Sequence, residues 1–429
     1  MDTFAATITS PPTGVSSTDN WKPRFFAIWT GQALSLIGSA LTQFVLLWWI
    51  TDTTGSASAL AIAGVMALLP QALLGPLGGT LADRLPRRVI MIVADVITAV
   101  CMVVLIVLFA TSSIQLWHAY VLMFIRGSMQ AFQQPAAAAS TAMLVPQEWL
   151  ARVAGMNQAL QGIMTIAGAP LGALALAFLP LQGALAIDVV TALLGITPLF
   201  IFVIPQIRTP KNEQASVWAD FTVGVHYVVG KRGLLMLYGI IGLVVLTVMP
   251  SFSMTPLLVK QHFGGGVNQV ALMEALAGIG IILGGVLITV WGGFKRKVVT
   301  LLVSFAISCG TVALTALTPG NLLLLAAAWW FISGATFSTG NAPFTALLQT
   351  TVPNEMQGRV LSLLSTVMGV AGPIGLAIAG PLGEAIGVRG VFIVGGTLSA
   401  LVCVLAFLSK DLMRLEDEAV PSPNGRGQG

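Results

Sequence analysis

The sequence predicts an all-α membrane protein with twelve transmembrane helices in two six-helix repeats. Three observations predict this fold class. Of the 429 residues, 56% are hydrophobic and only 8% are charged, and the mean hydropathy is +0.90, so the chain has too few polar side chains to cover a water-soluble globule. Apolar runs of about 20 residues, long enough to cross the hydrocarbon of a bilayer, recur along the whole chain. The two halves of the chain also share an order of motifs.

Twelve apolar runs lie between breaks that are charged or rich in glycine and proline. Each run is long enough to form one membrane-spanning helix, because an α-helix rises ~1.5 Å per residue. The predicted spans are residues 25–50, 58–80, 88–111, 117–145, 152–179, 183–205, 233–259, 268–291, 298–318, 321–350, 357–386 and 389–409.

The repeat is visible in paired motifs at a nearly constant offset. The longest internal polar break, residues 206–232, separates the two copies, and its apolar residues at helical spacing favour an amphipathic helix on the membrane surface over a plain solvated linker. The paired residues are Pro135, Val145, Pro146, Glu148 and Arg152 in the first copy and Pro343, Val352, Pro353, Glu355 and Arg359 in the second. The expected domains are a flexible cytoplasmic tail (1–22), a six-helix bundle (23–205), a cytoplasmic linker with an interfacial helix (206–232), a second six-helix bundle (233–409) and a second flexible cytoplasmic tail (410–429).

The basic residues indicate how the spans are oriented. With a cytoplasmic N-terminus, all but three of the 20 Lys and Arg residues fall in cytoplasmic loops and tails, and the exceptions are Arg126, Lys260 and Arg389. This asymmetry is what the positive-inside rule predicts, so we expect both termini to be cytoplasmic. The formal charge of +4 therefore reflects membrane orientation. Interleaved basic and aromatic patches are absent, and no nucleic-acid partner is predicted.

Several other functional classes lack their sequence motifs. The sequence has no Gly-x-x-x-x-Gly-Lys-Ser/Thr loop to hold ATP phosphates. Its three histidines are scattered, and its three cysteines lie within apolar spans without paired spacing, which argues against a metal or disulfide framework. We therefore predict neither an enzyme nor a cofactor, and a channel would not need a duplicated six-span unit.

A charged segment between the second and third spans is the most informative motif. It reads Gly79-Thr-Leu-Ala-Asp83-Arg84-Leu-Pro86-Arg87-Arg88. So much charge must meet water, so the segment is predicted to be a short loop. Its carboxylate and guanidinium groups could cap neighbouring helix ends and clamp the two halves together on the inner side, with Gly79 leaving room for close helix approach. The alternative is that the arginines only fix the topology.

This loop resembles the loop between helices 2 and 3 in the major facilitator superfamily of secondary transporters, which usually has glycine where this sequence has Pro86. Twelve spans in two repeats match that superfamily's architecture, in which the substrate site lies between the halves. Residues 20–57 and 353–360 also resemble its macrolide-efflux branch. The resemblance implies a protein of the bacterial cytoplasmic membrane that exports drugs by exchange for protons. The expected partners are a small-molecule substrate, protons and the lipid bilayer, and we expect a monomer.

The resemblance leaves other readings open. One alternative is a siderophore or metabolite exporter of the same fold, because siderophore exporters share the Asp83 loop. Another is a membrane receptor or scaffold that uses a transporter-like fold without transport.

Polar side chains at helical spacing mark one face of each of three predicted spans. At ~100° per residue, positions at +3, +7 and +11 stay within a stripe of roughly 80°. We expect the three stripes to face a common cavity, although interhelical hydrogen bonding in a closed bundle is the alternative. The stripes consist of Gln32, Ser35, Ser39 and Gln43 in the first span, Arg126, Gln130 and Gln133 in the fourth, and Asn157, Gln161 and Thr165 in the fifth.

Ionisable groups within the spans are candidates for proton coupling. Arg126 lies about 12 Å along its helix from the outer end, where a charge is costly unless it serves a function, and it resembles the superfamily's fourth-span arginine, implicated in proton coupling. Asp188 and Glu274 are the leading proton carriers, because a carboxyl group that alternates between environments can change its protonation state. Asp95 is a further candidate, although its position favours bracing the inner gate beside Asp83. The alternative for Arg126 is a charge that only locks helices together.

Prolines mark two further segments. In the fifth span, Gly168, Pro170 and Gly172 resemble the Gly-Pro motif of antiporters in the superfamily, with Ala169 in place of the usual glycine. This resemblance favours export, although a proline kink with small residues serves any transporter. In the seventh span, Pro250 and Pro256 predict a kinked segment near an adaptable surface of aromatic and methionine residues, which would suit a large amphipathic substrate.

Overall fold

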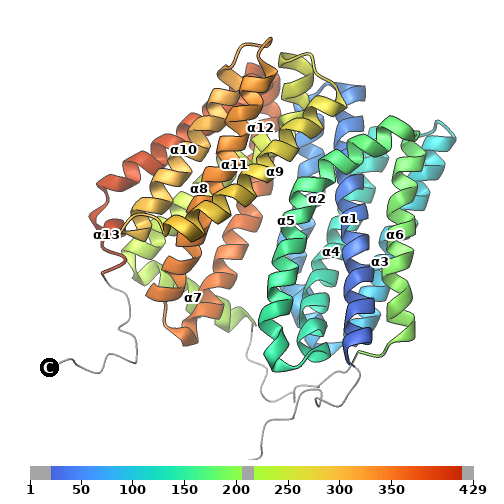
Figure 1. The fold of residues 1–429 in the computed structure, drawn as a ribbon, viewed down its shortest axis with the longest axis horizontal. Helices are drawn as coiled ribbons and strands as arrows, with labels where there is room; N and C mark the ends of the chain where they lie inside the picture. Colours follow the sequence, from blue (N-terminus) through green and yellow to red (C-terminus); the bar gives the residue numbers. More distant parts are fainter. Residues whose placement is uncertain (1–20, 205–216, 418–429) are drawn as a thin grey trace, which may run out of the picture.

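The computed structural model describes residues 21–204 and 217–417, and these residues form helices and no strands (Figure 1). The helices are α1 (Trp21–Thr54), α2 (Ala57–Arg84), α3 (Arg87–Ala110), α4 (Leu116–Leu144), α5 (Gln147–Phe178), α6 (Leu181–Ile201), α7 (Val217–Gly230), α8 (Arg232–His262), α9 (Val267–Trp291), α10 (Lys297–Leu317), α11 (Leu323–Thr351), α12 (Asn354–Leu405), the 3-10 helix η2 (Ala406–Leu408) and α13 (Lys410–Met413).

Prolines and one serine define where several helices begin. Pro86, Pro146, Pro180 and Pro353 are the N-cap residues of α3, α5, α6 and α12, where a missing backbone N–H costs no helical hydrogen bond. Ser56 caps α2 by accepting a hydrogen bond from the Ala59 amide at 3.2 Å. Because Pro146 and Pro353 are paired in the sequence repeat, they start equivalent helices in the two halves of the chain.

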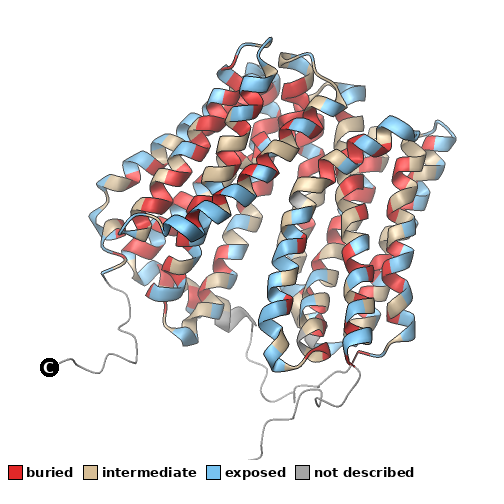
Figure 2. Cartoon of the chain, in the orientation of Figure 1, coloured by how far each residue is buried: buried red, intermediate tan, exposed pale blue. Residues whose placement is uncertain are grey.

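The long helices form two groups that lie side by side. We call α1–α6 the N-terminal bundle and α8–α13 with η2 the C-terminal bundle. The bundles are closest at the end that holds the α1–α2 and α8–α9 connections, and they diverge towards the other end (Figure 1). Buried residues line the helix contacts, and exposed residues face outward (Figure 2). Large apolar side chains such as Phe178, 80% exposed, and Val290, 82% exposed, face outward, as lipid contact requires.

Nine of the described helices are long and apolar enough to cross a membrane, or ten when the bent α5 counts as one span. Twelve spans were predicted, and two features account for the difference. The helix α12 combines the last two predicted spans across Gly387, whose φ is 77°. The helix α4 is 29 residues long, but its arginine and three glutamines make it less apolar. The all-helical, multi-pass fold class is confirmed. The number of described helices that are long and apolar enough to cross a membrane is lower than the twelve predicted.

Glycines allow the closest helix contacts. A Cβ atom added at Gly78 would lie 2.1 Å from the Ala131 carbonyl oxygen, and one at Gly127 would lie 2.4 Å from that of Ala67, so α2 and α4 touch backbone to backbone. The prediction that Gly79 permits close approach is wrong for this structure, because nothing lies within 4 Å of a Cβ added there. The contact belongs to Gly78, one residue or ~100° around the helix.

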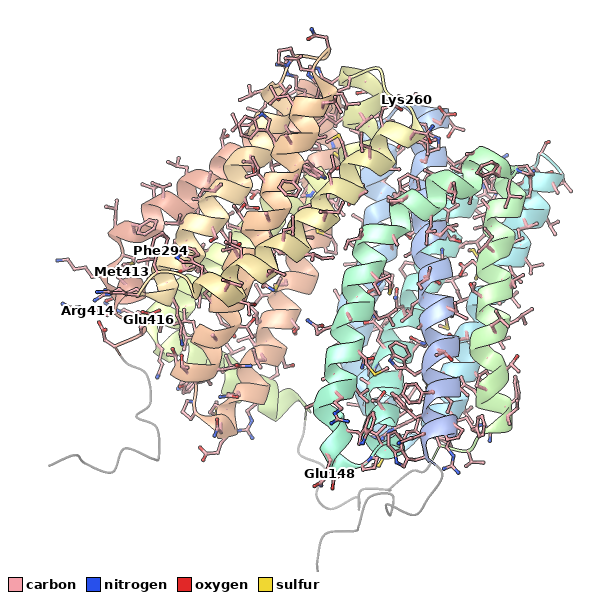
Figure 3. The ribbon with its side chains drawn as sticks, viewed as in Figure 1. Glu148, Lys260, Phe294, Met413, Arg414 and Glu416 are labelled. Atoms are coloured by element: carbon pink, nitrogen blue, oxygen red, sulfur yellow. The ribbon has the colours of Figure 1, made fainter. Side chains whose placement is uncertain are left out.

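Polar contacts join the two bundles at one end, which we call the closed end. Lys260 of α8 pairs with Asp52 of α1 at 2.7 Å and lies at this end of the molecule (Figure 3). Gln261 donates to the Gly55 carbonyl at 2.7 Å. Glu384 of α12 accepts hydrogen bonds from the Ser56 hydroxyl at 2.6 Å and the Ser58 amide at 3.0 Å.

The C-terminal segment differs from the flexible tail expected for residues 410–429. The helix α13 packs through Leu412, which is fully buried, and Leu415 is 1% exposed. Glu416 accepts a hydrogen bond from the Val298 amide at 2.9 Å and so caps the start of α10. Residues 410–416 are therefore docked on the C-terminal bundle. Residues 418–429 and the tail before Trp21 lie outside the described residues.

The predicted linker is described only in part. Its residues 206–216 lie outside the described residues, and α7 covers Val217–Gly230. A helix was expected here, and its position on the membrane surface remains a prediction. Gly224 of α7 lies against the Arg359 backbone, with 3.2 Å between a Cβ added there and the carbonyl oxygen, so α7 packs on the start of α12.

Candidate functional site

A cavity of about 420 Å³ opens among the helices of the N-terminal bundle and α8. We call it the polar chamber. Its lining includes most of the predicted polar stripe of α1 and α4, together with Asp95 of α3 and Gln71 of α2. The predicted residues that line it are Ser35, Ser39, Gln43, Asp95, Arg126, Gln130 and Gln133. The helical spacing therefore identified the correct faces of two helices.

A buried ion pair lies in the wall of this chamber. Arg126 Nη2 is 3.2 Å from Asp188 Oδ2, and the two side chains are 11% and 1% exposed. The Ser39 hydroxyl donates to Asp188 Oδ1 at 3.1 Å. Arg126 Nε is buried without a hydrogen-bond partner among the described residues. Asp188 is thus held by α1 and α4 together, and its charge is balanced by one guanidinium.

A second carboxylate lies nearby without such a cation. Gln32 Nε2 donates to Asp95 Oδ2 at 2.9 Å and to the Gly195 carbonyl at 3.2 Å, and Gln133 Nε2 donates to Gln32 Oε1 at 2.6 Å. Among the side chains that the structure describes, Asp95 has an amide partner and no cationic one. Asp95 therefore belongs to the polar chamber network. The prediction that it braces the inner gate has no contact to support it here.

A larger cavity of about 850 Å³ adjoins the polar chamber. We call it the apolar chamber, because valine, phenylalanine, methionine, glycine and proline residues from both bundles form most of its wall. Gly75, Gly79 and Thr80 of α2 and Ser362 and Ser365 of α12 line it, so it extends towards the end of the molecule that carries the Gly79–Arg88 loop. Four residues line both chambers, namely Leu68, Gln71, Met249 and Phe252.

The loop arginines contact helix ends within the N-terminal bundle. Arg87 Nε donates to the Ala82 carbonyl at 3.1 Å and its Nη1 to the Ala139 carbonyl at 2.9 Å. Arg88 donates to the carbonyls of Leu199 and Phe200 in the last turn of α6, where a cation is favoured by the helix dipole. The Asp83 side chain lies outside the described residues, so its predicted clamp role remains a prediction. Arg84 is exposed at the end of α2.

Other predicted site residues lie elsewhere. On α5, Asn157 accepts a hydrogen bond from Trp29 Nε1 at 2.8 Å, and neither Asn157 nor Gln161 lines either chamber. The side chain of Thr165 is outside the described residues. Met164 is the α5 residue that lines the polar chamber. The prediction of a common cavity for all three stripes is therefore wrong for the described part of α5.

Glu274 and the antiporter-like motif are also separate from the Arg126 pair. Glu274 lies on α9 and lines neither chamber. In the motif, a Cβ added at Gly168 would lie 3.3 Å from the Ala40 side chain, and one at Gly172 would lie 2.5 Å from Phe44. Pro170 lies within α5 between them. The motif thus allows α5 to pack closely on α1, and proton coupling by Glu274 remains a prediction.

Gln71 is a cavity residue that the sequence analysis missed. It donates to the Ala67 carbonyl at 3.0 Å and to Gln130 Oε1 at 3.2 Å. The signal was present, because an amide after Pro70 in an otherwise apolar span needs a protein or water partner. Gln71 is a single polar residue in its span, however, so helical spacing alone did not identify it.

No group of three or more His, Cys, Asp or Glu side chains in residues 21–204 and 217–417 could hold a metal ion.

The sequence profile described as Major Facilitator Superfamily matches residues 28–326 and 234–427, which together cover most of the chain. The chain belongs to the Major Facilitator Superfamily. It is therefore a multi-pass membrane protein, and its family is one of transporters rather than enzymes. The resemblance to this superfamily, which the sequence analysis drew first from the Gly79–Arg88 loop, is confirmed.

Three relatives of this chain are named as efflux proteins. Macrolide efflux protein A of Streptococcus pyogenes is 30% identical over 399 residues, which cover 93% of this chain and 98% of the relative. Macrolide efflux protein A of Enterococcus faecalis is 29% identical over 323 residues, covering 75% of this chain and 100% of the relative. Multidrug efflux pump Tap of Mycolicibacterium fortuitum is 24% identical over 395 residues, covering 89% and 93%.

Solved structures of the same fold are more distant in sequence. The nucleoside transporter NupG superposes with a TM-score of 0.70 at 12% identity, covering 91% of this chain and 99% of that chain. A bacterial homolog of the lysosomal transporter Spinster, in an inward-facing and unoccupied conformation, has a TM-score of 0.66 at 15% identity and covers 94% and 98%. At these identities the likeness shows the fold alone.

Proposed function

We propose that this protein exports amphipathic small molecules of the macrolide type by proton antiport with alternating access. The substrate class is supported by the macrolide efflux proteins that resemble nearly the whole chain. The observation that carries the coupling mechanism is a set of three buried ionisable side chains at the polar chamber, namely the Arg126–Asp188 pair and Asp95, which is hydrogen-bonded to Gln32 instead of a cation.

The charges of these three side chains favour exchange of a proton. Of the two carboxylates, only Asp188 pairs with the Arg126 guanidinium, so the negative charge of Asp95 is left without a cation when both are ionised. A buried uncompensated charge is costly, and a proton bound at Asp95 or Asp188 would remove it. Release of that proton to the other side of the membrane would restore the charge. Asp188 carries the proton in this proposal, Arg126 sets its affinity, and Asp95 and Glu274 are the further candidates.

The two chambers support loading from the side of the Gly79–Arg88 loop. The bundles contact at the closed end, whereas the apolar chamber reaches towards the loop end. With the positive-inside orientation, the loop end is cytoplasmic. A drug would then enter the apolar chamber from the cytoplasm or the inner leaflet and leave after the closed end opens and the loop end closes. In that second state Asp83 would clamp the bundles.

Drug accumulation in cells tests the proposal. Expression of the protein should lower cellular accumulation of erythromycin, and a protonophore that collapses the proton gradient should restore it. An Asp188→Asn variant of equal membrane abundance is the control for lysis and altered permeability. If erythromycin and other macrolides accumulate equally with and without the protein, while loss of the protein reduces siderophore secretion, the siderophore exporter replaces this proposal. Binding of a compound without any transport would favour a receptor.

A further inference from the structure

The passage between the two chambers is formed by both bundles. Leu68 and Gln71 come from α2, and Met249 and Phe252 come from α8. We call these four residues the neck. Because α2 and α8 belong to different bundles, any motion of one bundle against the other changes the neck.

Phe252 differs from its neighbours on α8. It is 41% exposed, whereas Ser251, Met254 and Thr255 are fully buried. It is also the only aromatic residue of the neck, and a phenyl ring is large enough to occlude a narrow passage. Gln71, by contrast, is fixed by hydrogen bonds to Ala67 and Gln130.

Two prolines remove backbone hydrogen-bond donors from the helix around Phe252. Pro250 and Pro256 lie within α8 and have no N–H, so the carbonyls of Leu246 and Phe252 lack their usual helical partners. The Leu246 carbonyl oxygen lies 1.9 Å from where a Cβ of Gly375 would be, so α12 packs directly against the freed carbonyl. The segment that carries Phe252 is therefore anchored to α12 on one side and faces the chambers on the other.

Aromatic packing holds the Phe252 ring in the neck. Its centroid is 5.2 Å from that of Trp330 on α11, with 50° between the planes. Trp330 is fully buried, and its ring centroid is 6.0 Å from that of Phe392 on α12. The Phe252 ring is thus supported by a fixed aromatic wall, while no hydrogen bond restrains it.

We infer that Phe252 is a specificity-determining residue, which sets how large a molecule can occupy both chambers at once. The inference rests on the proposed export function. A macrolide is larger than the polar chamber, so a macrolide that contacts the polar chamber has to extend through the neck into the apolar chamber. A compact cation fits in one chamber and does not depend on the neck.

Transport of two probes by purified protein in proteoliposomes tests this role. The probes are erythromycin, a large macrolide, and ethidium, a compact planar cation, and the readout is the ratio of their kcat/KM values. Phe252→Ala and Phe252→Leu widen the neck and should raise the ratio of erythromycin to ethidium by about tenfold or more, because even one methylene in a pocket is worth about 10–200-fold. Phe252→Trp narrows the neck and should lower the ratio by a similar factor.

Phe337→Ala is the matched control. Phe337 is also an exposed aromatic residue, at 40%, and it stacks on Phe305 with centroids 5.7 Å apart, but it lines the apolar chamber and not the polar one. The Phe337→Ala variant should change the kcat/KM values of both probes by the same factor and leave their ratio unchanged. A variant that reaches the membrane but no longer transports can still be tested by equilibrium binding of both probes to detergent-solubilised protein. The ratio of the two binding affinities then replaces the ratio of kcat/KM values.

Two results would overturn the inference. One is a ratio within twofold of wild type in every Phe252 variant, and the other is a Phe337→Ala shift as large as that of Phe252→Ala. Failure of the proposed function is distinguishable, because the wild-type protein would then transport neither probe. In that case this role of Phe252 is rejected with it.

Discussion

The ion pair between Arg126 and Asp188 gives the sharpest prediction about single residues. The two side chains are 11% and 1% exposed, with 3.2 Å between Nη2 and Oδ2. Asp188→Asn keeps an acceptor for Ser39 but leaves the guanidinium without its counter-charge. Breaking a buried pair by removing one partner costs about 3–5 kcal/mol. Because the polar chamber gives Arg126 some access to water, we expect the lower end of this range.

The double variant separates the charge from the fold. Arg126→Gln with Asp188→Asn places two neutral amides where two charges were, so no charge is stranded. We therefore expect it to be more stable than either single variant, with a coupling energy of about 2 kcal/mol or more. The melting temperatures of the purified proteins should follow the order wild type, double variant, single variants. Ser39→Ala, which removes one hydrogen bond worth about 1 kcal/mol, is the control for a minor change at the same carboxylate.

Transport by the same variants tests coupling. Asp188→Asn should abolish uphill accumulation in inverted vesicles under an imposed pH gradient, while downhill exchange of substrate continues. Arg126→Ala should impair transport more than Arg126→Lys, which retains the charge. The reasoning is refuted if Asp188→Asn melts at the wild-type temperature and still concentrates substrate to the wild-type level.

Four further predictions follow from the fold and the loop. Single cysteines at Arg88 and Arg296 should react only with membrane-permeant reagents in intact cells, and labelling by an impermeant reagent would reverse the topology. Glu384→Gln should open the closed end about two- to fivefold more often, measured as impermeant labelling of a cysteine in the polar chamber; equal labelling would remove Glu384 from the contact. Asp83→Asn should slow transport with normal membrane insertion, and unchanged turnover would leave Asp83 a topology residue. Gly127→Ala should destabilise the protein through the α2–α4 contact, whereas Gly79→Ala, its matched control, should not.

Helical periodicity predicted much of the site because it depends on local geometry. Ser39 and Gln32 of α1 were placed on one face, and that face meets Asp188 and Asp95. The depth of Arg126 in an apolar span also meant that it must face protein or water, and in the structure it faces Asp188. In these cases an unpaired polar group in a membrane is so costly that only a few arrangements of these side chains are possible.

Other features depend on how a helix is rotated and which neighbour it meets, which periodicity does not determine. The stripe of α5 is real, but its Asn157 meets Trp29 outside both chambers. Gly79 and Gly78 differ by one position, yet only Gly78 faces α4. The docking of residues 410–416 depends on Glu416 reaching the start of α10, over a hundred residues away in sequence. Such contacts are set by tertiary packing.

Simultaneous measurement of drug and proton fluxes tests the central claim most directly. Purified protein in proteoliposomes, loaded with a pH-sensitive dye, is given labelled erythromycin with and without an imposed pH gradient. Proton antiport predicts that the gradient drives erythromycin above its equilibrium concentration, and that an erythromycin gradient alone drives protons in the opposite direction. Asp188→Asn should abolish both fluxes against a gradient. Erythromycin movement that never exceeds equilibrium and carries no proton flux would contradict the account.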